Sequence, residues 1–323
     1  MRERPHLRSG VVPVLLVPFD SDGAVDVPGL RREIEFLLEL PIAGLGIGFG
    51  SEVTRLTFEE KLLVVGIAAE MKQDSMPLVA SLIAGGTHVG AALAKALGDA
   101  GATVLMAPPP TGVGSVLALR DQVVDYYHVL ALASGAEIMV QDAPAMTGVE
   151  LPLAMFEALF ELPDVTSFKV EVVAPAPKIG ALRSALGDDA VLFGGQAGLD
   201  FYHELQRGVN GTLPGSATPE VFLEAFRRFE DDDYEGSNGL LSRHLGVQLL
   251  AQRDFDTFLY VQKLLLVRRG IFNSPALRGP CVPLDPQLER EVAELADSLL
   301  DVGGIPVLEW SGDIPVGTES EFH

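Results

Sequence analysis

The sequence contains a single cysteine, Cys281, among its 323 residues. One cysteine cannot form a disulfide within the chain, which excludes a disulfide-stabilised secreted fold and fits the reducing cytoplasm. No histidine lies near this cysteine in the sequence, so nothing marks it as a catalytic nucleophile. We therefore expect a cytoplasmic protein that is stabilised by its hydrophobic core.

Long hydrophobic runs and positive charge are also scarce. No segment reaches the roughly 18 apolar residues that a membrane-spanning helix needs, and no apolar stretch follows the N-terminal arginines. The 45 acidic residues outnumber the 23 Lys and Arg residues, which gives a net charge of −22 at pH 7. Such a charge repels phosphate backbones and anionic lipids. The sequence thus predicts that neither nucleic acid nor a membrane is a partner.

Recognisable metal and cofactor motifs are missing. The six histidines show no two-ligand spacing, and neither H-E-x-x-H nor C-x-x-C occurs. The glycines of GLGIGFG (44–50) match G-x-G-x-x-G in no register, so we interpret them as a tight strand-to-loop turn. His88 stands where a helix is predicted to begin, and we interpret it as a structural residue. We expect neither a metal nor a cofactor.

Eight short apolar runs alternate with longer helical patterns in the first 216 residues. Most of these runs are apolar at nearly every position, as strands of a parallel sheet are when helices cover both faces. A strand followed by a helix eight times is typical of a closed (β/α)8 TIM barrel. A doubly wound open sheet is the competing topology, because periodicity alone does not exclude it. The predicted strands are residues 11–19, 44–49, 77–83, 103–109, 137–143, 165–172, 190–196 and 208–215.

After residue 216 the pattern becomes helical. We therefore predict a (β/α)8 barrel over residues 1–232, a C-terminal helical bundle over residues 233–301 and an irregular tail over residues 302–323. Thr57 and Glu60 have the spacing of a capping box at the start of the second helix. The predicted helices include residues 27–40, 57–72, 87–101, 115–134, 218–232, 234–252, 254–270 and 286–301.

Lys169 is the only one of the six lysines that lies in a predicted strand, within TSFKVEVV (166–173). Side chains alternate along a strand, so Ser167, Lys169 and Glu171 share one face. The other face is apolar and suits contact with the outer helices. This leaves Lys169 inside the barrel near the C-terminal end of the strand, where barrel enzymes build their active sites. The other five lysines lie in predicted helical segments and are compatible with solvent exposure.

Two interpretations of this lysine stand equal on the residues alone. Burying an ammonium group costs several kcal/mol unless the group is paired or neutralised. A desolvated lysine is a good nucleophile toward a carbonyl and forms a Schiff base that acts as an electron sink. A buried Lys169–Glu171 ion pair without any chemistry would satisfy the same sequence.

Four segments resemble, in order and spacing, the dihydrodipicolinate synthase / N-acetylneuraminate lyase family of Schiff-base aldolases. The segments are GVVPVLLVPFDSDGAVD, GLGIGFGSEVTRLTFEEK, QDAPAMTG and SFKVEVV, and the likeness runs from about residue 10 to residue 285. The resemblance implies that Lys169 is the Schiff-base residue, because the family's lysine on strand six falls on it. It further implies a lyase that acts on a small 2-oxo acid or related carbonyl compound and forms a homotetramer or homodimer.

The chain departs from this family at residues that shape the reaction. Where the family has GTTGE the chain has GFGSE, so Phe49 and Gly50 replace two threonines that serve the proton relay and the substrate carboxylate. Where the family has YNxPxRTG the chain has QDAPAMTG, so Gln141 replaces the proton-shuttling tyrosine and Met146 replaces the carboxylate-binding arginine. Glutamine cannot exchange a proton as a phenol does, and methionine cannot pair with a carboxylate. These replacements speak against activity as dihydrodipicolinate synthase itself.

Substrate binding is predicted around the two altered motifs. The backbone N–H groups of Gly50 and Ser51, with the Ser51 hydroxyl, would bind a carboxylate in place of the lost side chains. Phe49 and Met146 make the predicted pocket more apolar, which indicates a less polar or larger substrate. The predicted substrate-binding residues are Gly48, Phe49, Gly50, Ser51, Glu52, Gln141 and Met146.

Proton transfer must come from a group other than tyrosine. Asp142, Glu171 and Glu52 are the candidates, and Glu171 is best placed because it shares a strand face with Lys169. We predict a catalytic set of Lys169, Glu171 and Asp142. The leading hypothesis is a lyase that cleaves or forms a C–C bond through a Lys169 Schiff base with a 2-oxo acid. A Schiff-base dehydratase or decarboxylase and a catalytically silent metabolite-binding protein are the alternatives.

Overall fold

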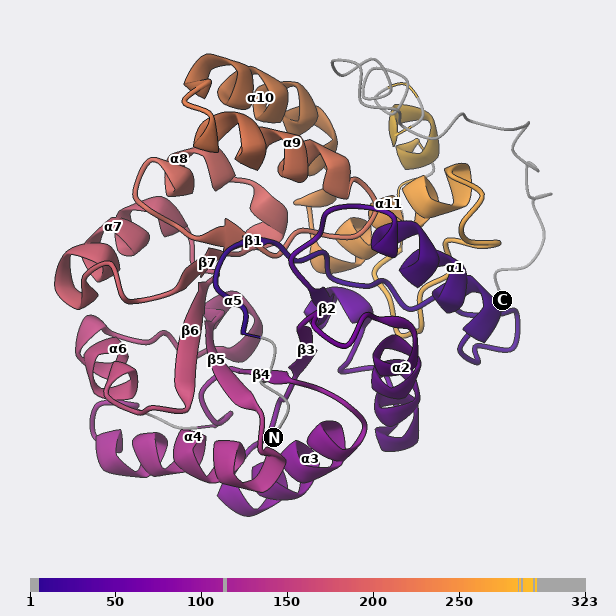
Figure 1. Cartoon of the computed structure of the whole chain (residues 1–323). Helices are drawn as coiled ribbons and strands as arrows, with labels where there is room; N and C mark the ends of the chain where they lie inside the picture. The colour runs from indigo at the N-terminus through magenta and orange to yellow at the C-terminus, as the bar shows by residue number, and fades with distance from the viewer. Residues whose placement is uncertain (1–5, 113–114, 284, 286, 293, 295–323) are drawn as a thin grey trace.

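A computed structural model describes residues 6–112, 115–283, 285, 287–292 and 294 of the chain. Its centre is one sheet of eight parallel strands in the order β1-β8-β7-β6-β5-β4-β3-β2. Figure 1 shows these strands at the centre of the molecule, with the helices arranged around them. The strands are β1 (Gly10–Val11), β2 (Leu45–Ile47), β3 (Leu78–Ser81), β4 (Val104–Ala107), β5 (Glu137–Asp142), β6 (Val165–Val170), β7 (Leu192–Gly194) and β8 (Gly211–Thr212).

The sheet closes through the residues that follow β1. Val14 forms parallel bridges to both Gly46 on β2 and Gly215 beyond β8. In addition, the Leu15 N–H donates to the Gly46 carbonyl at 2.8 Å, and the Gly46 N–H donates to the Pro13 carbonyl at 2.9 Å. The two ends of the strand order therefore meet, as a barrel requires. The predicted (β/α)8 barrel is confirmed, and the open doubly wound sheet is excluded.

The first strand is shorter than predicted. The sequence pattern indicates a strand over residues 11–19, but the regular part of β1 ends at Val11. Pro13 and Pro18 interrupt this run and have no N–H group to donate to a neighbouring strand. The segment nevertheless stays buried from Val11 to Phe19 and supplies the bridges that close the barrel.

Helices cover the outside of the barrel, and the predicted capping box starts the second one. The Glu60 N–H donates to Thr57 Oγ1 at 3.2 Å, and the Thr57 N–H donates to Glu60 Oε2 at 2.8 Å. The helices are α1 (Val27–Leu38), α2 (Phe58–Met71), α3 (Thr87–Asp99), α4 (Arg120–Ser134), α5 (Pro144–Thr147), α6 (Leu153–Phe160), α7 (Pro175–Leu186), α8 (Phe201–Leu205), α9 (Pro219–Glu230), α10 (Tyr234–Ala251) and α11 (Phe255–Arg268), with short 3-10 turns η1 (Phe49–Ser51) and η2 (Gln196–Gly198).

The core has two parts, one inside the barrel and one between the strands and the helices. The interior cluster includes Val79, Val104, Met139 and Phe193. Phe193 is the register partner of Lys169 on the neighbouring strand. Because paired residues on adjacent strands share a face, Lys169 points into the barrel, as the alternation of its strand predicts.

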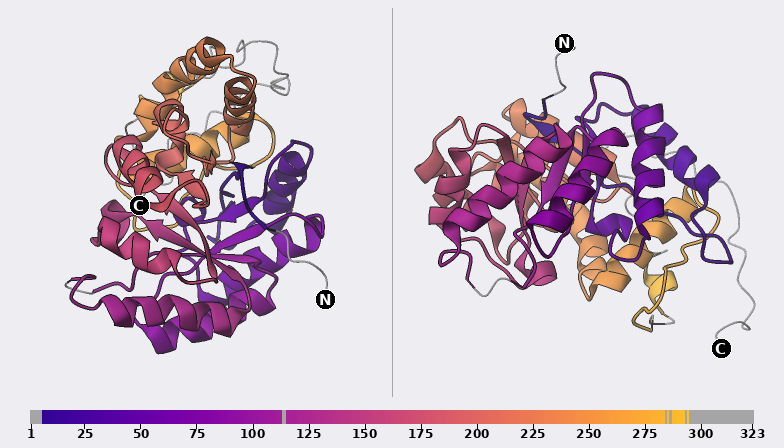
Figure 2. Two further views of the ribbon diagram at one scale, coloured as in Figure 1. Left: turned by 60° about the vertical axis from the view of Figure 1, so that its left-hand side comes forward. Right: turned by 90° about the horizontal axis from the view of Figure 1, so that it is seen from below.

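The C-terminal helices continue the chain beyond the barrel. Helix α10 contacts both α9 and α11, and the left view of Figure 2 shows the C-terminal helices above the strands. Helices α10 and α11 confirm the predicted C-terminal extension, whereas the domain boundaries stay predictions. The predicted tail, residues 302–323, lies outside the described residues, as does most of the predicted helix over 286–301.

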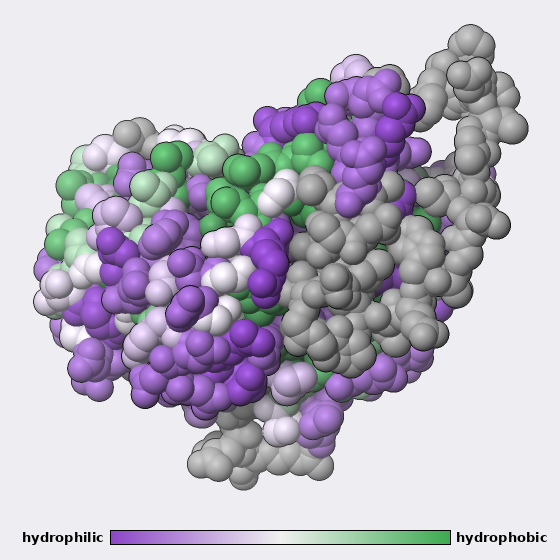
Figure 3. Space-filling view, turned by 90° about the horizontal axis from the view of Figure 1, so that it is seen from above, coloured by the Kyte–Doolittle hydropathy of each residue, from purple (hydrophilic) through white to green (hydrophobic). Residues whose placement is uncertain are grey.

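The described surface carries mostly polar residues. Figure 3, which views the molecule from the top of Figure 1, shows mainly hydrophilic residues with smaller apolar areas between them. Within the described residues, no helix combines the length and the apolar character that crossing a membrane requires.

Glu33 is an acidic residue of α1 that is fully buried beside the barrel. Its Oε1 accepts hydrogen bonds from the Leu16 N–H at 2.8 Å and from the Ser216 hydroxyl at 2.5 Å. Burial outweighs these contacts and raises the pKa of Glu33 to about 8. The carboxyl group is therefore mostly protonated in the folded protein at neutral pH.

Glu33→Gln is expected to stabilise the protein more at pH 8 than at pH 5. The pKa of Glu33 is higher in the folded than in the unfolded chain, so its contribution is complete below about pH 4.5 and is lost as the pH rises to about 8. Glutamine imitates the protonated acid and removes this loss, which amounts to at most about 1.4 kcal/mol per pH unit. Urea unfolding of both proteins at the two pH values measures the difference. A free-energy difference that is the same at both pH values contradicts the assignment.

Candidate active site

A pocket opens around Lys169, at the C-terminal ends of the strands. Lys169 lies one residue before the end of β6, and only 5% of its surface is exposed. The pocket is enclosed by the segments after β2, β5 and β7, by residues around β1 and β8, and by the start of α11. Its lining consists of Val14, Phe49, Gly50, Ala145, Met146, Lys169, Glu171, Gln196, Ala197, Leu213, Pro214, Gly215, Ala251, Gln252, Asp254, Phe255 and Phe258.

The predicted pair of Lys169 and Glu171 is present in the pocket. Lys169 Nζ lies 3.2 Å from Glu171 Oε2. The same carboxylate accepts a hydrogen bond from Gln141 Nε2 at 2.8 Å and another from the Gln196 backbone N–H at 3.0 Å. Strands β5 and β6 and the turn after β7 therefore each contribute one donor to Glu171. These contacts fix the carboxylate beside the lysine.

The ionisation of Glu171 follows from these contacts. Burial raises the pKa of a carboxyl group, but the Lys169 ammonium and the hydrogen bonds from Gln141 and Gln196 outweigh burial, so the pKa of Glu171 lies below its ordinary value. Glu171 is consequently a carboxylate at neutral pH. It can accept a proton from a reacting group but has none to give until it has received one.

The turn that holds Glu171 is strained. Gln196 and Ala197 have φ values of 48° and 55°, in the left-handed region that residues with a side chain rarely occupy. Each such residue costs of the order of 1–3 kcal/mol, and strain of this kind concentrates at functional sites. The turn is held by Gln248, whose Nε2 donates to the Ala197 carbonyl at 3.0 Å. A side-chain carbon on Gly195 would lie 2.6 Å from Glu171 Cβ, so the tight approach requires glycine there.

The altered motifs contribute to the pocket only in part. Phe49, Gly50 and Met146 line it, as predicted, and Gln141 is fully buried behind the lining, where it contacts Glu171. Ser51 does not line the pocket.

Ser51 cannot serve as the predicted carboxylate ligand in this conformation. Its hydroxyl donates to the Leu15 carbonyl at 2.5 Å and accepts from the Gly48 N–H at 3.1 Å. Its own N–H donates to the Gly48 carbonyl at 2.9 Å. These bonds stabilise the η1 turn, and neither Gly48 nor Ser51 is part of the lining.

Asp142 lies on the other face of β5. Its register partner is Val170, whereas Gln141 pairs with Lys169, so Asp142 points away from the barrel interior. Its Oδ2 lies 2.6 Å from Lys178 Nζ on α7, and its Oδ1 accepts from the Leu151 N–H at 2.9 Å. Burial raises the pKa of Asp142, although Lys178 and the Leu151 N–H oppose this effect. The structure therefore does not bring Asp142 to Lys169.

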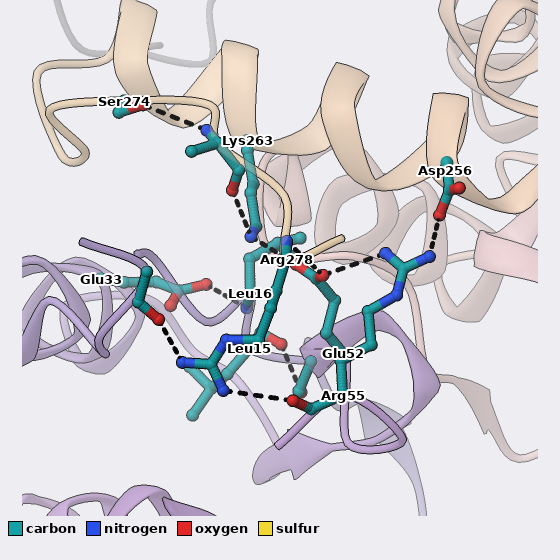
Figure 4. Close-up of polar contacts among 12 residues, drawn as sticks. Leu15, Leu16, Glu33, Glu52, Arg55, Asp256, Lys263, Ser274 and Arg278 are labelled. Carbon is teal, nitrogen blue, oxygen red and sulfur yellow. Dashed lines mark hydrogen bonds and ion pairs between the residues drawn. The ribbon is translucent and has the colours of Figure 1, made fainter. Parts of the chain in front are cut away.

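Glu52 also lies outside the pocket lining, in a buried ionic network that Figure 4 shows. Lys263 Nζ donates to its Oε1 at 2.5 Å, and Arg55 Nη1 and the Arg278 backbone N–H donate to its Oε2, each at 3.1 Å. Arg55 also pairs with Asp256 of α11. The network therefore ties the segment after η1 to α11 and to the chain around residue 278.

The prediction that Lys263 is compatible with solvent was wrong. This lysine of α11 is fully buried, and it also donates to the Ala276 carbonyl at 2.9 Å and lies 4.3 Å from the centre of the Phe19 ring. Burial lowers the pKa of Lys263, while Glu52 opposes this effect. Apolar residues on both sides in VQKLLLV are the only local signal of its burial.

Several lining residues are absent from the sequence-based set. Gln196 comes from the turn after β7, and Gln252, Asp254, Phe255 and Phe258 come from the end of α10 and the start of α11. Their positions depend on how the C-terminal helices fold back over the barrel, which no local pattern reveals. Among the described residues, no group of three His, Cys, Asp or Glu side chains is placed to hold a metal ion.

Comparisons with known proteins extend over nearly the whole chain. The model of the "Dihydrodipicolinate synthetase family" matches residues 7–299. A curated relative, L-2-keto-3-deoxyarabonate dehydratase of Azospirillum brasilense, is 26% identical over 94% of this chain and 96% of its own length.

Two solved structures have the same fold. Dihydrodipicolinate synthase from Rhodopseudomonas palustris superposes with a TM-score of 0.83 at 22% identity and covers 93% of this chain and 100% of its own. YagE of Escherichia coli K12, solved in complex with pyruvate, has a TM-score of 0.82 at 20% identity and covers 91% of this chain and 99% of its own.

Glu52→Gln is expected to destabilise the protein by about 3–5 kcal/mol, because it leaves the buried Lys263 ammonium without its partner. Lys263→Met should have a cost of similar size. The double variant should lose clearly less than the sum of the two, since both ends of the pair are then neutral. Urea unfolding of the four proteins gives the coupling energy.

The exposed pair of Lys95 and Asp99 provides the control for this cycle. Their side chains are 67% and 66% exposed and 2.6 Å apart, so Lys95→Ala should change stability by less than about 1 kcal/mol. Strictly additive effects of Glu52→Gln and Lys263→Met would show that the buried pair does not couple the two segments.

Proposed function

The chain belongs to the dihydrodipicolinate synthetase family of lyases, and we propose that Lys169 forms a Schiff base with a 2-oxo acid to cleave or form a C–C bond. The observation that carries this proposal is the buried Lys169 amine at the pocket wall, 3.2 Å from the Glu171 carboxylate. A lysine that only balanced a carboxylate would have no need to line a pocket. The presence of pyruvate in the YagE structure supports a 2-oxo acid as the class of substrate.

The first step is imine formation. Glu171 accepts a proton from the Lys169 ammonium, and the neutral Nζ then attacks the carbonyl carbon, so that a C–N bond forms while the C–O π bond breaks. The proton that the attacking nitrogen then loses moves to the oxygen, which becomes a hydroxyl group. The hydroxyl group receives the proton from Glu171 and leaves as water. The resulting iminium carries a positive charge, which the Glu171 carboxylate stabilises at short range.

The iminium then serves as the electron sink. In the cleavage direction, a base removes the proton of the hydroxyl group on C4, the C3–C4 bond breaks, and its electron pair forms the enamine while an aldehyde leaves. Protonation of C3 and hydrolysis return the 2-oxo acid and free Lys169. Glu171 is the carboxylate placed to exchange these protons, because it is ionised and its partners hold it beside Nζ.

Dehydration through the same imine is the second candidate. Gln141 occupies the tyrosine position and cannot exchange a proton, whereas loss of a proton from C3 and of hydroxide from C4 needs one base that then becomes the acid. Glu171 can fill both roles. The similarity to a dehydratase over 94% of the chain supports this route.

The proposal also covers the cellular location and the oligomeric state of the protein. We infer a cytoplasmic homotetramer or homodimer, which the family resemblance and the single cysteine, exposed Cys281, support. Decarboxylation through the same imine is a further alternative reaction, and a silent metabolite-binding role is an outcome of the trapping experiment below.

Reduction with borohydride in the presence of pyruvate is expected to add one reduced pyruvate to Lys169. The imine is reduced to a stable amine, which intact-mass measurement and peptide mapping detect. Lys169→Ala should lose the adduct, while Lys178→Arg, which changes the lysine paired with Asp142, should keep it. Circular dichroism of Lys169→Ala and of the closer substitute Lys169→Met separates loss of chemistry from loss of folding. The absence of an adduct across a panel of 2-oxo acids would favour a silent binding protein.

Glu171→Gln is expected to slow imine formation at pH 7 by about 100-fold or more, because the group that takes the lysine proton is lost. In the native protein the pKa of Glu171 lies below its ordinary value, so its contribution to the rate is complete at neutral pH and is lost only in acid, as the pH falls through this lowered pKa. The rate of the trapped adduct between pH 4 and pH 8 measures both effects. Asp142→Asn should slow the reaction far less, since Asp142 lies on the opposite face of β5. Equal effects of the two substitutions would contradict the role of Glu171.

A further inference from the structure

The start of α11 gives the pocket an aromatic wall. Phe255 and Phe258 both line the pocket, and their rings stack with centroids 6.2 Å apart and planes inclined by 23°. Phe49 of η1 lines it as well. Phe258 lies 3.8 Å from the position that a side-chain carbon on Gly50 would occupy, so α11 reaches across to η1. Together the three rings border an apolar region that is continuous with Lys169.

The charges of the pocket lining disfavour a substrate that carries a second anionic group besides its 2-oxo acid carboxylate. Within the described lining, Lys169 is the only cationic side chain, and Glu171 already balances it. The remaining charged residue is Asp254, whose carboxylate accepts from the Thr257 N–H at 2.9 Å and from the Thr257 hydroxyl at 2.6 Å. Asp254 thereby caps the N-terminus of α11, so the positive end of this helix is already used.

Asp254 adds negative charge to the pocket. Burial raises the pKa of its carboxyl group, but the hydrogen bonds from Thr257 outweigh burial and hold the pKa below its ordinary value. The pocket therefore presents two carboxylates and one ammonium. A substrate with a carboxylate or phosphate beyond its 2-oxo acid group would lose hydration there without gaining a cation.

One carboxylate can still be bound beside Lys169 by a neutral donor. Gln196 lines the pocket, and its side-chain amide has no hydrogen-bond partner among the described residues, while the backbone N–H of the same residue donates to Glu171. An amide can donate two hydrogen bonds to a carboxylate without adding charge. The Gln196 amide can therefore bind the one carboxylate of a 2-oxo acid.

We propose that the substrate is a 2-oxo monoacid whose carbon chain carries an aromatic or similarly flat apolar group and no second anionic group. This proposal rests on the Lys169 Schiff base proposed above. Polyhydroxylated chains fit this region less well, because the described lining, apart from Lys169 and Glu171, offers polar side chains only from Gln196, Gln252 and Asp254. Hydroxyl groups placed against the phenyl rings would lose their hydrogen bonds to water.

Four compounds test this proposal in the wild-type protein: pyruvate, benzylidenepyruvate, para-carboxybenzylidenepyruvate and a 2-keto-3-deoxy sugar acid. The rate of the borohydride-trapped adduct at Lys169 is measured by mass spectrometry for each. Benzylidenepyruvate should react at least about tenfold faster than its para-carboxylate, which has the same reactive group but a second anion. It should also exceed the sugar acid.

Substitutions in the pocket lining test whether the aromatic wall causes the preference for benzylidenepyruvate. Phe258→Ala should lower the ratio of the benzylidenepyruvate rate to the pyruvate rate by about tenfold, and Phe255→Ala provides a second reading if Phe258→Ala does not fold. Asp254→Asn should narrow the gap between benzylidenepyruvate and its para-carboxylate. Leu249→Ala, at an exposed residue of α10 outside the lining, should leave both ratios unchanged.

Two results would overturn the proposal. If the para-carboxylate or the sugar acid reacts as fast as benzylidenepyruvate, or if the Phe258 and Phe255 substitutions leave the ratio unchanged, the aromatic wall does not select the substrate. In either case a pyruvate adduct at Lys169 would still support the Schiff base. Failure of every compound to form an adduct would instead contradict the proposed function itself.

Discussion

The site depends on one carboxylate that is held by three donors. Glu171, which directly follows β6, is contacted by the Lys169 ammonium from β6, the Gln141 amide from β5 and the Gln196 N–H from the turn after β7. A buried ammonium without such a partner would cost several kcal/mol, so the pair makes it possible for a lysine to lie inside the barrel. The same arrangement keeps Glu171 ionised and within proton-transfer distance of the amine. Structure and chemistry therefore rest on the same contacts.

A second buried lysine, Lys263, lies in a structural ion pair. Lys263 pairs with Glu52 away from the pocket lining, and Arg55 extends this network to Asp256 of α11. The network joins the segment after η1 to the helix that carries Phe258 into the pocket. The two lysines thus differ in their surroundings: Lys169 lines the pocket and is the proposed Schiff-base residue, and Lys263 links the segments that carry the pocket walls.

The sequence was sufficient to predict the barrel and the inward position of Lys169. Eight strand and helix repeats indicate the fold, and the alternation of β6 places Lys169 and Glu171 on one inward face. It was not sufficient for residues whose neighbours come from distant segments. Lys263 is buried because α11 folds back over η1. Asp142 points away from the barrel interior because it directly follows Gln141 on β5, and consecutive residues of a strand face opposite sides. The aromatic wall of α11 has the same origin in tertiary contacts, which local patterns do not encode.

Every step of the proposed chemistry requires the amine of Lys169. The most direct test is peptide mapping after borohydride reduction in the presence of pyruvate, because it identifies the residue that carries the adduct. The account predicts a single reduced adduct on the peptide that contains Lys169 and unmodified peptides for the other lysines. An adduct on another lysine, or no adduct while the protein is folded and binds 2-oxo acids, would contradict it.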